Sequence, residues 1–187
     1  MSKRIALGLF LGLAAVQLYV PISMVAHREW VLKHGEAFRF RVVPIDPYDA
    51  FRGRYIALKT EGDEVPAQGK EFLPNKRVYA LLKVDEQGWA KISGATFQRP
   101  AGVPYLLAKT GYVYGGKVTL RLPMDRYYME EKAAPLAESV YREHSRNDKK
   151  DAYITVRIQE GFPVIEGLFV DGKRIEDFIK TLAPSGK

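Results

Sequence analysis

Residues 46–60 read DPYDAFRGRYIALKT, a turn that leads directly into a strand. Asp46-Pro47 and Asp49 favour turn geometry, because proline fixes φ and aspartate side chains bond to nearby backbone amides. Gly53 ends the turn, and residues 54–59 then alternate between the two faces of an expected strand. The alternation is imperfect, so the strand is expected to lack a purely apolar face.

The chain on either side of this stretch is rich in short strand patterns. Residues 38–42 alternate apolar and basic side chains at a period of two, which is typical of a half-buried strand. Further strands are expected at residues 77–84, 89–97, 105–114, 117–122, 152–159, 164–170 and 173–175. Residues 133–146 show the only helical spacing of the predicted soluble part, and the final residues look frayed. The pattern predicts a mainly β domain, α+β at the margin, built as an antiparallel barrel or sandwich with one helix.

The N-terminal part has the composition of a transmembrane helix. The run from Ile5 to Ala26 carries no charge, and as a helix it would extend over about 33 Å at about 1.5 Å per residue. That length matches a hydrocarbon core of about 30 Å. A cleaved signal peptide and a buried helix of a soluble protein are the competing interpretations.

The charges around this run set the expected topology. Lys3 and Arg4 precede it, which favours a cytoplasmic N-terminus, although Arg28 and Lys33 follow it. We therefore expect residues 1–34 to form a cytoplasmic tip, a single-pass anchor and a juxtamembrane turn. Residues 35–187 are expected to form an extracytoplasmic, periplasmic domain at the bacterial inner membrane.

Composition excludes several classes of protein. The 187 residues contain no cysteine, which rules out disulfides, thiolate zinc sites and a cysteine nucleophile. The net charge of +7 permits attraction to anionic lipid, but the chain has no basic run with interleaved aromatic residues, so we expect no nucleic-acid partner. The three histidines lack metal-ligand spacing. No metal and no cofactor are predicted.

The opening stretch also carries a resemblance. The chain resembles the bacterial membrane-anchored proteins named for the motif Gly-Asp-Tyr-x-x-Leu-x-Tyr, preceded by Asp-Pro and Phe-Arg pairs. Residues 53–60 here read GRYIALKT, with Arg54 in place of the acid of the motif and Thr60 in place of its last tyrosine. The resemblance implies a single-span extracytoplasmic domain, in a family whose genes often accompany those of multispan membrane proteins. It implies no enzyme mechanism.

A basic and aromatic set is the candidate binding surface, because tyrosine and arginine supply many of the strongest contacts at protein interfaces. Its members are Asp46, Asp49, Arg52, Gly53, Arg54, Tyr55, Leu58, Tyr127, Tyr128 and Glu130. A structural role is the alternative, with the tyrosines half-buried and Arg52 paired to a turn aspartate.

Two catalytic or metal-binding interpretations follow from other residues. Lys91 and Ser93 share a strand face, which suggests a Ser/Lys nucleophile pair. Acids near Asp46, together with residues 61–64, supply oxygen atoms of the kind that a hard cation prefers, but their spacing matches no known loop. Ordinary exposed polar and turn-capping roles are the alternatives.

The favoured hypothesis is an accessory or binding subunit that docks on an integral membrane protein partner and contacts the lipid bilayer. Gly8 and Gly12, with Ala15 near the same face, form a small-x-x-x-small pattern that would let another helix approach. An anchored hydrolase acting on peptide or envelope polymer is the first alternative, and a self-assembling structural protein is the second. The sequence identifies no ligand, substrate or partner stoichiometry.

Overall fold

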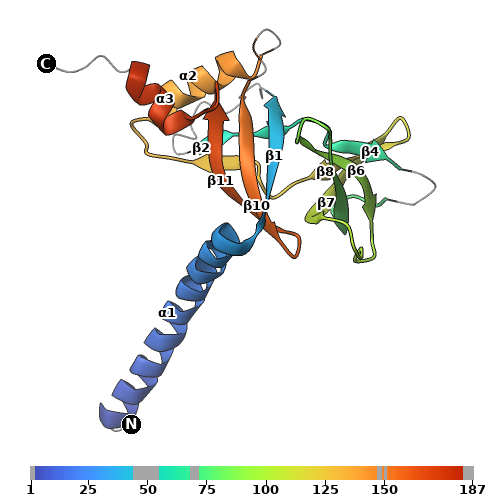
Figure 1. The fold of residues 1–187 in the computed structure, drawn as a ribbon. Helices are drawn as coiled ribbons and strands as arrows, with labels where there is room; N and C mark the ends of the chain where they lie inside the picture. Colours follow the sequence, from blue (N-terminus) through green and yellow to red (C-terminus); the bar gives the residue numbers. More distant parts are fainter. Residues whose placement is uncertain (1–2, 44–54, 68–71, 147–148, 150, 183–187) are drawn as a thin grey trace, which may run out of the picture.

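The fold is mainly β, with one long helix at the N-terminus (Figure 1). The computed structural model describes residues 3–43, 55–67, 72–146, 149 and 151–182, apart from the side chain of Ala6. The helices are α1 (Lys3–His34), α2 (Ala134–His144) and α3 (Ile175–Leu182). The strands are β1 (Glu36–Val43), β2 (Tyr55–Ala57), β3 (Lys59–Thr60), β4 (Glu64–Pro66), β5 (Arg77–Val84), β6 (Ala90–Thr96), β7 (Tyr105–Tyr114), β8 (Lys117–Arg121), β9 (Arg126–Tyr128), β10 (Tyr153–Gln159), β11 (Phe162–Val170) and β12 (Lys173–Arg174).

The described strands form two five-stranded antiparallel sheets and one ribbon in a barrel-like arrangement. The first sheet has the order β12-β11-β10-β1-β3, and the second has the order β4-β8-β7-β5-β6. Strands β2 and β9 pair as the ribbon. The expected hairpins of residues 77–97 and 105–122 are confirmed as β5-β6 and β7-β8. The predicted mainly β antiparallel fold is therefore confirmed.

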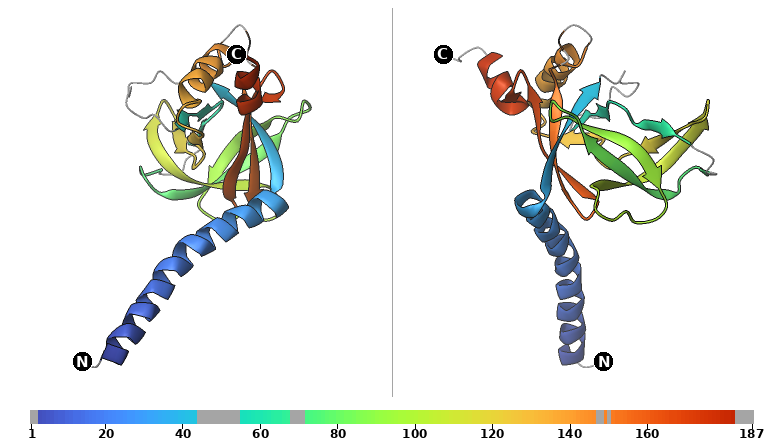
Figure 2. Two further views of the ribbon diagram at one scale, coloured as in Figure 1. Left: turned by 90° about the vertical axis from the view of Figure 1, so that its left-hand side faces the viewer. Right: turned by 45° about the vertical axis from the view of Figure 1, so that its right-hand side comes forward.

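One hydrophobic core joins the two sheets. Strand β1 contributes Phe38 and Phe40 by its period-two alternation, and the facing strand β10 contributes Ile154 and Val156 in the same way. Strands β5, β7 and β8 add buried residues to the same cluster. Figure 2 shows α2 and α3 at the end of the domain that lies away from α1.

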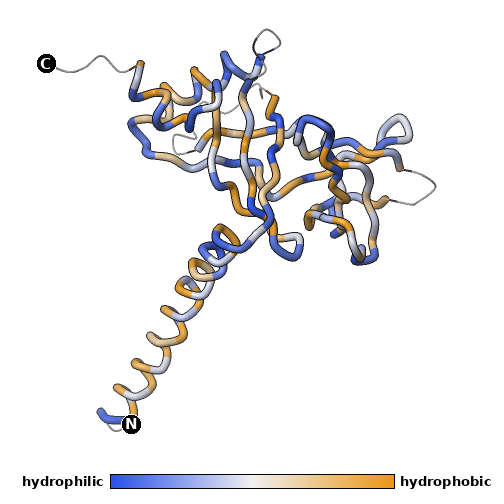
Figure 3. Tube along the Cα trace, in the orientation of Figure 1, coloured by the Kyte–Doolittle hydropathy of each residue, from blue (hydrophilic) through white to orange (hydrophobic). Residues whose placement is uncertain are grey.

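Helix α1 is long and apolar enough to cross a membrane once. Figure 3 shows its apolar length, and the hydrophilic residues where it meets the domain. It continues through Pro21. The most apolar stretch of 18 residues in α1 makes no buried contact with the other described residues. This contradicts the interpretation of α1 as a buried helix of a soluble protein.

The end of α1 is packed tightly onto the first sheet. Val31 is completely buried, and the backbone N–H of Gly35 donates to the Val31 carbonyl at 2.8 Å. The Arg157 guanidinium of β10 donates to the Gly35 carbonyl at 3.3 Å. The His27 ring meets Phe162 of β11 edge-on, with ring centroids 4.8 Å apart. The helix and the sheet are thus joined without a linker.

The turn of residues 85–89 joins the second sheet to the first. The Asp85 carboxylate accepts hydrogen bonds from the backbone N–H groups of Gln87 and Trp89 at 3.1 and 2.9 Å. These bonds hold Trp89 in place, and its backbone forms a parallel bridge with Arg39 of β1. The same bonds, with that of Trp89 the largest cause, lower the pKa of Asp85.

Two local predictions differ from the structure. The single strand expected at residues 54–59 is divided into β2 and β3, because the Leu58 N–H donates to the Asp125 carbonyl and β3 then pairs with β1. The prediction of a frayed C-terminus is wrong for residues 175–182, because these residues form α3. Ile175 and Ile179 bury one face of this helix, and their i, i+4 spacing is the signal for it.

Candidate functional site

The ribbon of β2 and β9 brings part of the predicted surface together. Tyr55 lies directly opposite Tyr128, and Ile56 lies opposite Tyr127. Strand β2 comes from the opening stretch and β9 from a segment about 70 residues later, so sequence alone gives no direct sign of this pairing. Five predicted members lie outside the described residues: Asp46, Asp49, Arg52, Gly53 and Arg54.

The exposed face of the ribbon is a small cation–aromatic cluster, here named the ribbon surface and consisting of Tyr55, Arg126 and Tyr128. The two tyrosine rings are 5.6 Å apart between centroids, and the Arg126 guanidinium lies 5.0 Å from the centre of the Tyr55 ring. A hydrogen bond with Tyr128 is the main reason that the pKa of Arg126 is raised. Tyr128 is 64% exposed, so the cluster is open to solvent.

Other predicted members do not reach this surface. Leu58 is 3% exposed and belongs to the hydrophobic core. The Tyr127 hydroxyl points the other way and donates to Glu176 of α3 at 2.5 Å. Burial, followed by this hydrogen bond, raises the pKa of Tyr127. The Glu130 side chain is exposed, and its carbonyl accepts the first hydrogen bonds before α2.

Removal of the Tyr127 hydroxyl tests this structural role. Tyr127→Phe is expected to lower the free energy of unfolding by about 1–2 kcal/mol, because a hydrogen bond to a charged acceptor is lost while Glu176 stays half-buried. Thermal unfolding of the full-length protein in detergent measures the loss. Tyr114→Phe is the matched control, since Tyr114 is 90% exposed. Equal melting temperatures for the two variants would contradict the assignment.

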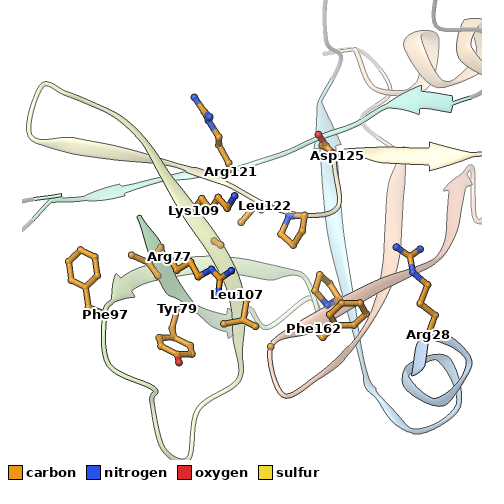
Figure 4. Close-up of a pocket in the computed structure, with 15 residues that line it drawn as sticks. Arg28, Arg77, Tyr79, Phe97, Leu107, Lys109, Arg121, Leu122, Asp125 and Phe162 are labelled. Atoms are coloured by element: carbon orange, nitrogen blue, oxygen red, sulfur yellow. The ribbon is translucent and has the colours of Figure 1, made fainter. Parts of the chain in front are cut away.

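A cleft of about 830 Å³ lies between the second sheet, the β10–β11 turn and the end of α1 (Figure 4). Apolar and basic side chains both line it. The lining residues are Arg28, Arg77, Val78, Tyr79, Phe97, Leu107, Ala108, Lys109, Arg121, Leu122, Pro123, Asp125, Gly161, Phe162 and Pro163.

Three of the four basic residues of the cleft form a row across three neighbouring strands. Arg77 of β5 lies directly opposite Lys109 of β7, and Lys109 lies directly opposite Arg121 of β8. None of the three makes an ion pair with another described residue. Asp125, the one acid among the described lining residues, is paired with Arg126 at 3.9 Å. This cationic row, defined as Arg77, Lys109 and Arg121, leaves the cleft strongly positive.

The proposed nucleophile pair has other partners in the structure. The Lys91 ammonium pairs with Asp85 at 3.0 Å, and the Ser93 hydroxyl donates to the Leu81 carbonyl at 3.3 Å. Each group therefore supports the β5–β6 hairpin instead of facing the other across a reaction site. No specific contact among the described residues favours hydrolase chemistry at this pair.

Two of the acids after the opening stretch pair with different lysines. Asp63 lies 3.7 Å from Lys59, and Glu64 lies 3.9 Å from Lys117. The described residues contain no group of three or more histidine, aspartate or glutamate side chains that could hold a metal ion. The predicted acids Asp46 and Asp49 lie outside the described residues.

Comparison with known proteins identifies the family of this chain. The family model described as GDYXXLXY protein matches residues 17–168, which is most of the chain. The chain belongs to the GDYXXLXY protein family. A search of the curated proteins and of the solved structures finds no match.

The described part of the motif in this GDYXXLXY protein is mainly structural. Tyr55 lies on the ribbon surface, whereas Leu58 is buried in the core. Thr60, which stands at the last motif position, is also buried and pairs with Val42 of β1. The motif therefore marks the point where the chain leaves the ribbon and enters the first sheet.

Sequence reasoning missed two features of this GDYXXLXY protein. The first is Arg126 of the ribbon surface, which adjoins the predicted Tyr127 and Tyr128. The second is the cationic row. Its signal is present in the alternation of β5, β7 and β8, but the strand register is needed to place the three basic residues opposite one another.

Proposed function

We propose that this GDYXXLXY protein is a single-pass accessory subunit, and that its β domain docks on an integral membrane protein partner. Helix α1 would cross the bacterial inner membrane with Lys3 and Arg4 on the cytoplasmic side. The domain would then lie outside the cytoplasm. The apolar length of α1 supports the membrane insertion.

The junction between α1 and the domain is the observation that carries this proposal. A domain on a flexible tether samples many orientations, and it loses that freedom when it binds. Here Val31 and Gly35 fix the end of α1 on the first sheet, and the bond from Arg157 adds a second attachment. The domain would therefore be held in one orientation above the bilayer. Such preorganisation favours docking on a partner in the same membrane.

Two surfaces are available for that docking. Gly8, Gly12 and Ala15 are exposed on α1, and a side chain built on either glycine would meet no atom within 4 Å. A neighbouring helix could approach the backbone closely at this point. The ribbon surface offers exposed tyrosine and arginine side chains for a second contact with the soluble part of the partner.

Filling the glycine face tests the proposal. Gly8→Leu combined with Gly12→Leu is expected to lower the yield of a co-purified membrane partner by roughly tenfold, which corresponds to about 1.4 kcal/mol. Ala14→Leu is the control, because it places a leucine about 200° around the helix from Gly12. The measurement is quantitative purification of the tagged protein from native membranes in mild detergent. An unchanged partner yield in the double variant would contradict the role of this face.

A further inference from the structure

The cationic row and the apolar wall beside it have no role in the proposed docking. We propose that the cleft binds one anionic phospholipid, taken from the membrane leaflet in which α1 ends. The phosphate group would lie against Arg77, Lys109 and Arg121. An acyl chain would lie against the neighbouring apolar side chains. The inference rests on the proposed membrane insertion of α1 but not on the proposed partner.

Without a bound anion, the cationic row destabilises the folded protein. Side chains directly opposite each other in an antiparallel pair lie about 4.5–5.5 Å apart at Cβ, and like charges at these positions are destabilising. Lys109 faces a like charge on both sides, and no described acid pairs with any of the three. A bound phosphate would offset this repulsion, since arginine and lysine both bind phosphate oxygens through charged hydrogen bonds.

The apolar wall lies one step along the same strands. Tyr79 is two residues from Arg77 on β5, Leu107 is two residues from Lys109 on β7, and these two lie opposite each other. Residues two apart on a strand share a face. Phe97 and Phe162 extend the wall from outside these strands (Figure 4). Leu107 is 41% exposed and Phe97 is 44% exposed, so an uncovered apolar surface adjoins the charges.

The contacts of the β10–β11 turn place the apolar wall on the membrane side. Phe162 touches His27 at the end of α1, and the Leu107 N–H donates to the Gly161 carbonyl at 2.9 Å. The order leading away from α1 is therefore Phe162, Leu107 and then Lys109. A lipid from the leaflet beside α1 would meet the apolar wall with its chain and the cationic row with its headgroup. Arg28 also lines the cleft at this end.

This arrangement favours a lipid over a soluble polyanion. A nucleic acid or an acidic polymer would be attracted by the charges but would leave the exposed surface of Leu107 and Phe97 uncovered. A neutral lipid would cover the apolar wall but leave the cationic row uncompensated. An anionic phospholipid satisfies both parts of the cleft.

Native mass spectrometry of the full-length protein in detergent tests the inference. The protein is titrated with phosphatidylglycerol, with phosphatidylcholine of the same acyl chains, and with glycerol phosphate as the free headgroup. We expect one bound phosphatidylglycerol per chain. We also expect at least about tenfold weaker binding of phosphatidylcholine and of glycerol phosphate.

Variants of the cleft separate its two parts. Lys109→Glu is expected to weaken phosphatidylglycerol binding by at least about tenfold. The same change should raise the melting temperature of the lipid-free protein by about 2 °C or more, because the introduced carboxylate would face two arginines. Leu107→Ser should weaken lipid binding without changing the charge of the cleft. Lys83→Glu is the matched control, since Lys83 is exposed on β5 but does not line the cleft.

The outcomes distinguish the inference from its alternatives. Equal binding of the two lipids would overturn the role of the cationic row, and equal binding of glycerol phosphate would overturn the role of the apolar wall. Equal losses in Lys109→Glu and Lys83→Glu would indicate diffuse attraction and overturn the site. Co-purification of a protein partner is a separate measurement, so failure of lipid binding leaves the accessory-subunit proposal intact.

Discussion

Replacement of Trp89 by alanine is expected to lower the free energy of unfolding by about 3 kcal/mol, the largest effect that we predict for one side chain. Trp89 ends the turn that precedes β6, and its ring lies against the outer face of the first sheet. The guanidinium groups of Arg39 and Arg41 lie 5.0 and 4.8 Å from the ring centre. Tyr153 meets the ring edge-on at 5.4 Å. Alanine would remove these contacts together.

The magnitude follows from the contacts that are lost. Each exposed cation–π contact contributes about 0.5–1 kcal/mol, and an aromatic pair contributes about 0.5–1.5 kcal/mol beyond its buried area. Loss of the buried indole surface adds to these terms. These contacts share one ring and are not independent. Their sum is therefore an upper estimate of the loss in the free energy of unfolding.

The chain offers a matched control for this measurement, because it contains a second tryptophan. Trp30 and Trp89 are its two tryptophans, and Trp30 is 54% exposed on α1, where it stacks on His34. Unfolding by guanidinium chloride is followed by circular dichroism of the full-length protein in detergent. Trp30→Ala is the control and should leave the transition within about 0.5 kcal/mol. A Trp89→Ala transition as stable as that of the control would show that the two sheets do not depend on this ring.

Gly35→Ala is expected to destabilise the domain by about 2–3 kcal/mol, because there is no room for a side chain at the junction. A Cβ atom on Gly35 would lie 2.6 Å from the Val31 carbonyl oxygen and 3.1 Å from the backbone nitrogen of Ile158. Both neighbours are backbone atoms, so relief requires α1 to move away from β10. The variant should therefore lose the fixed orientation of the domain as well as stability.

A second glycine provides the control for this substitution. A Cβ atom on Gly94 would meet only the Leu81 side chain, at an ordinary distance of 3.8 Å, so Gly94→Ala should leave the melting temperature unchanged or slightly higher. Limited proteolysis between α1 and β1 reports the loosened junction. If Gly35→Ala resists both heat and protease as well as Gly94→Ala does, then the tight junction does not exist in solution.

The local elements of this protein could be predicted because their signals are local. The uncharged run of α1, the Gly115-Gly116 turn between β7 and β8, and the helical spacing of α2 each depend on neighbouring residues. The glycine next to Thr110 likewise predicts the disturbed register at that point. Periodicity and turn chemistry are sufficient for these elements.

The long-range pairings could not be predicted for the opposite reason. Strand β1 pairs with β10, which places Arg39 opposite Thr155. No pattern in either strand indicates which strand it pairs with. The position of Trp89 over the first sheet depends on that pairing. The cationic row likewise requires the register of three strands. The prediction of a surface position for Leu58 is wrong because the sequence does not show where its strand divides.

The structure relates the family motif to the proposed function in a specific way. The buried end of the motif, Leu58 and Thr60, fixes the chain in the core, while Tyr55 projects into the ribbon surface. The same segment thus supports the fold and contributes to the surface that we propose for docking. The junction between α1 and β1 lies at one end of the domain, and the cleft that we propose as a lipid site adjoins it.

The most direct test of the accessory-subunit proposal is the intact mass of the complex released from native membranes in mild detergent. We expect a stoichiometric complex in which this 21.2 kDa chain is bound to one kind of integral membrane protein. A homo-oligomer would favour the self-assembling structural protein instead. A bare chain, with at most bound lipid, would contradict the accessory-subunit proposal.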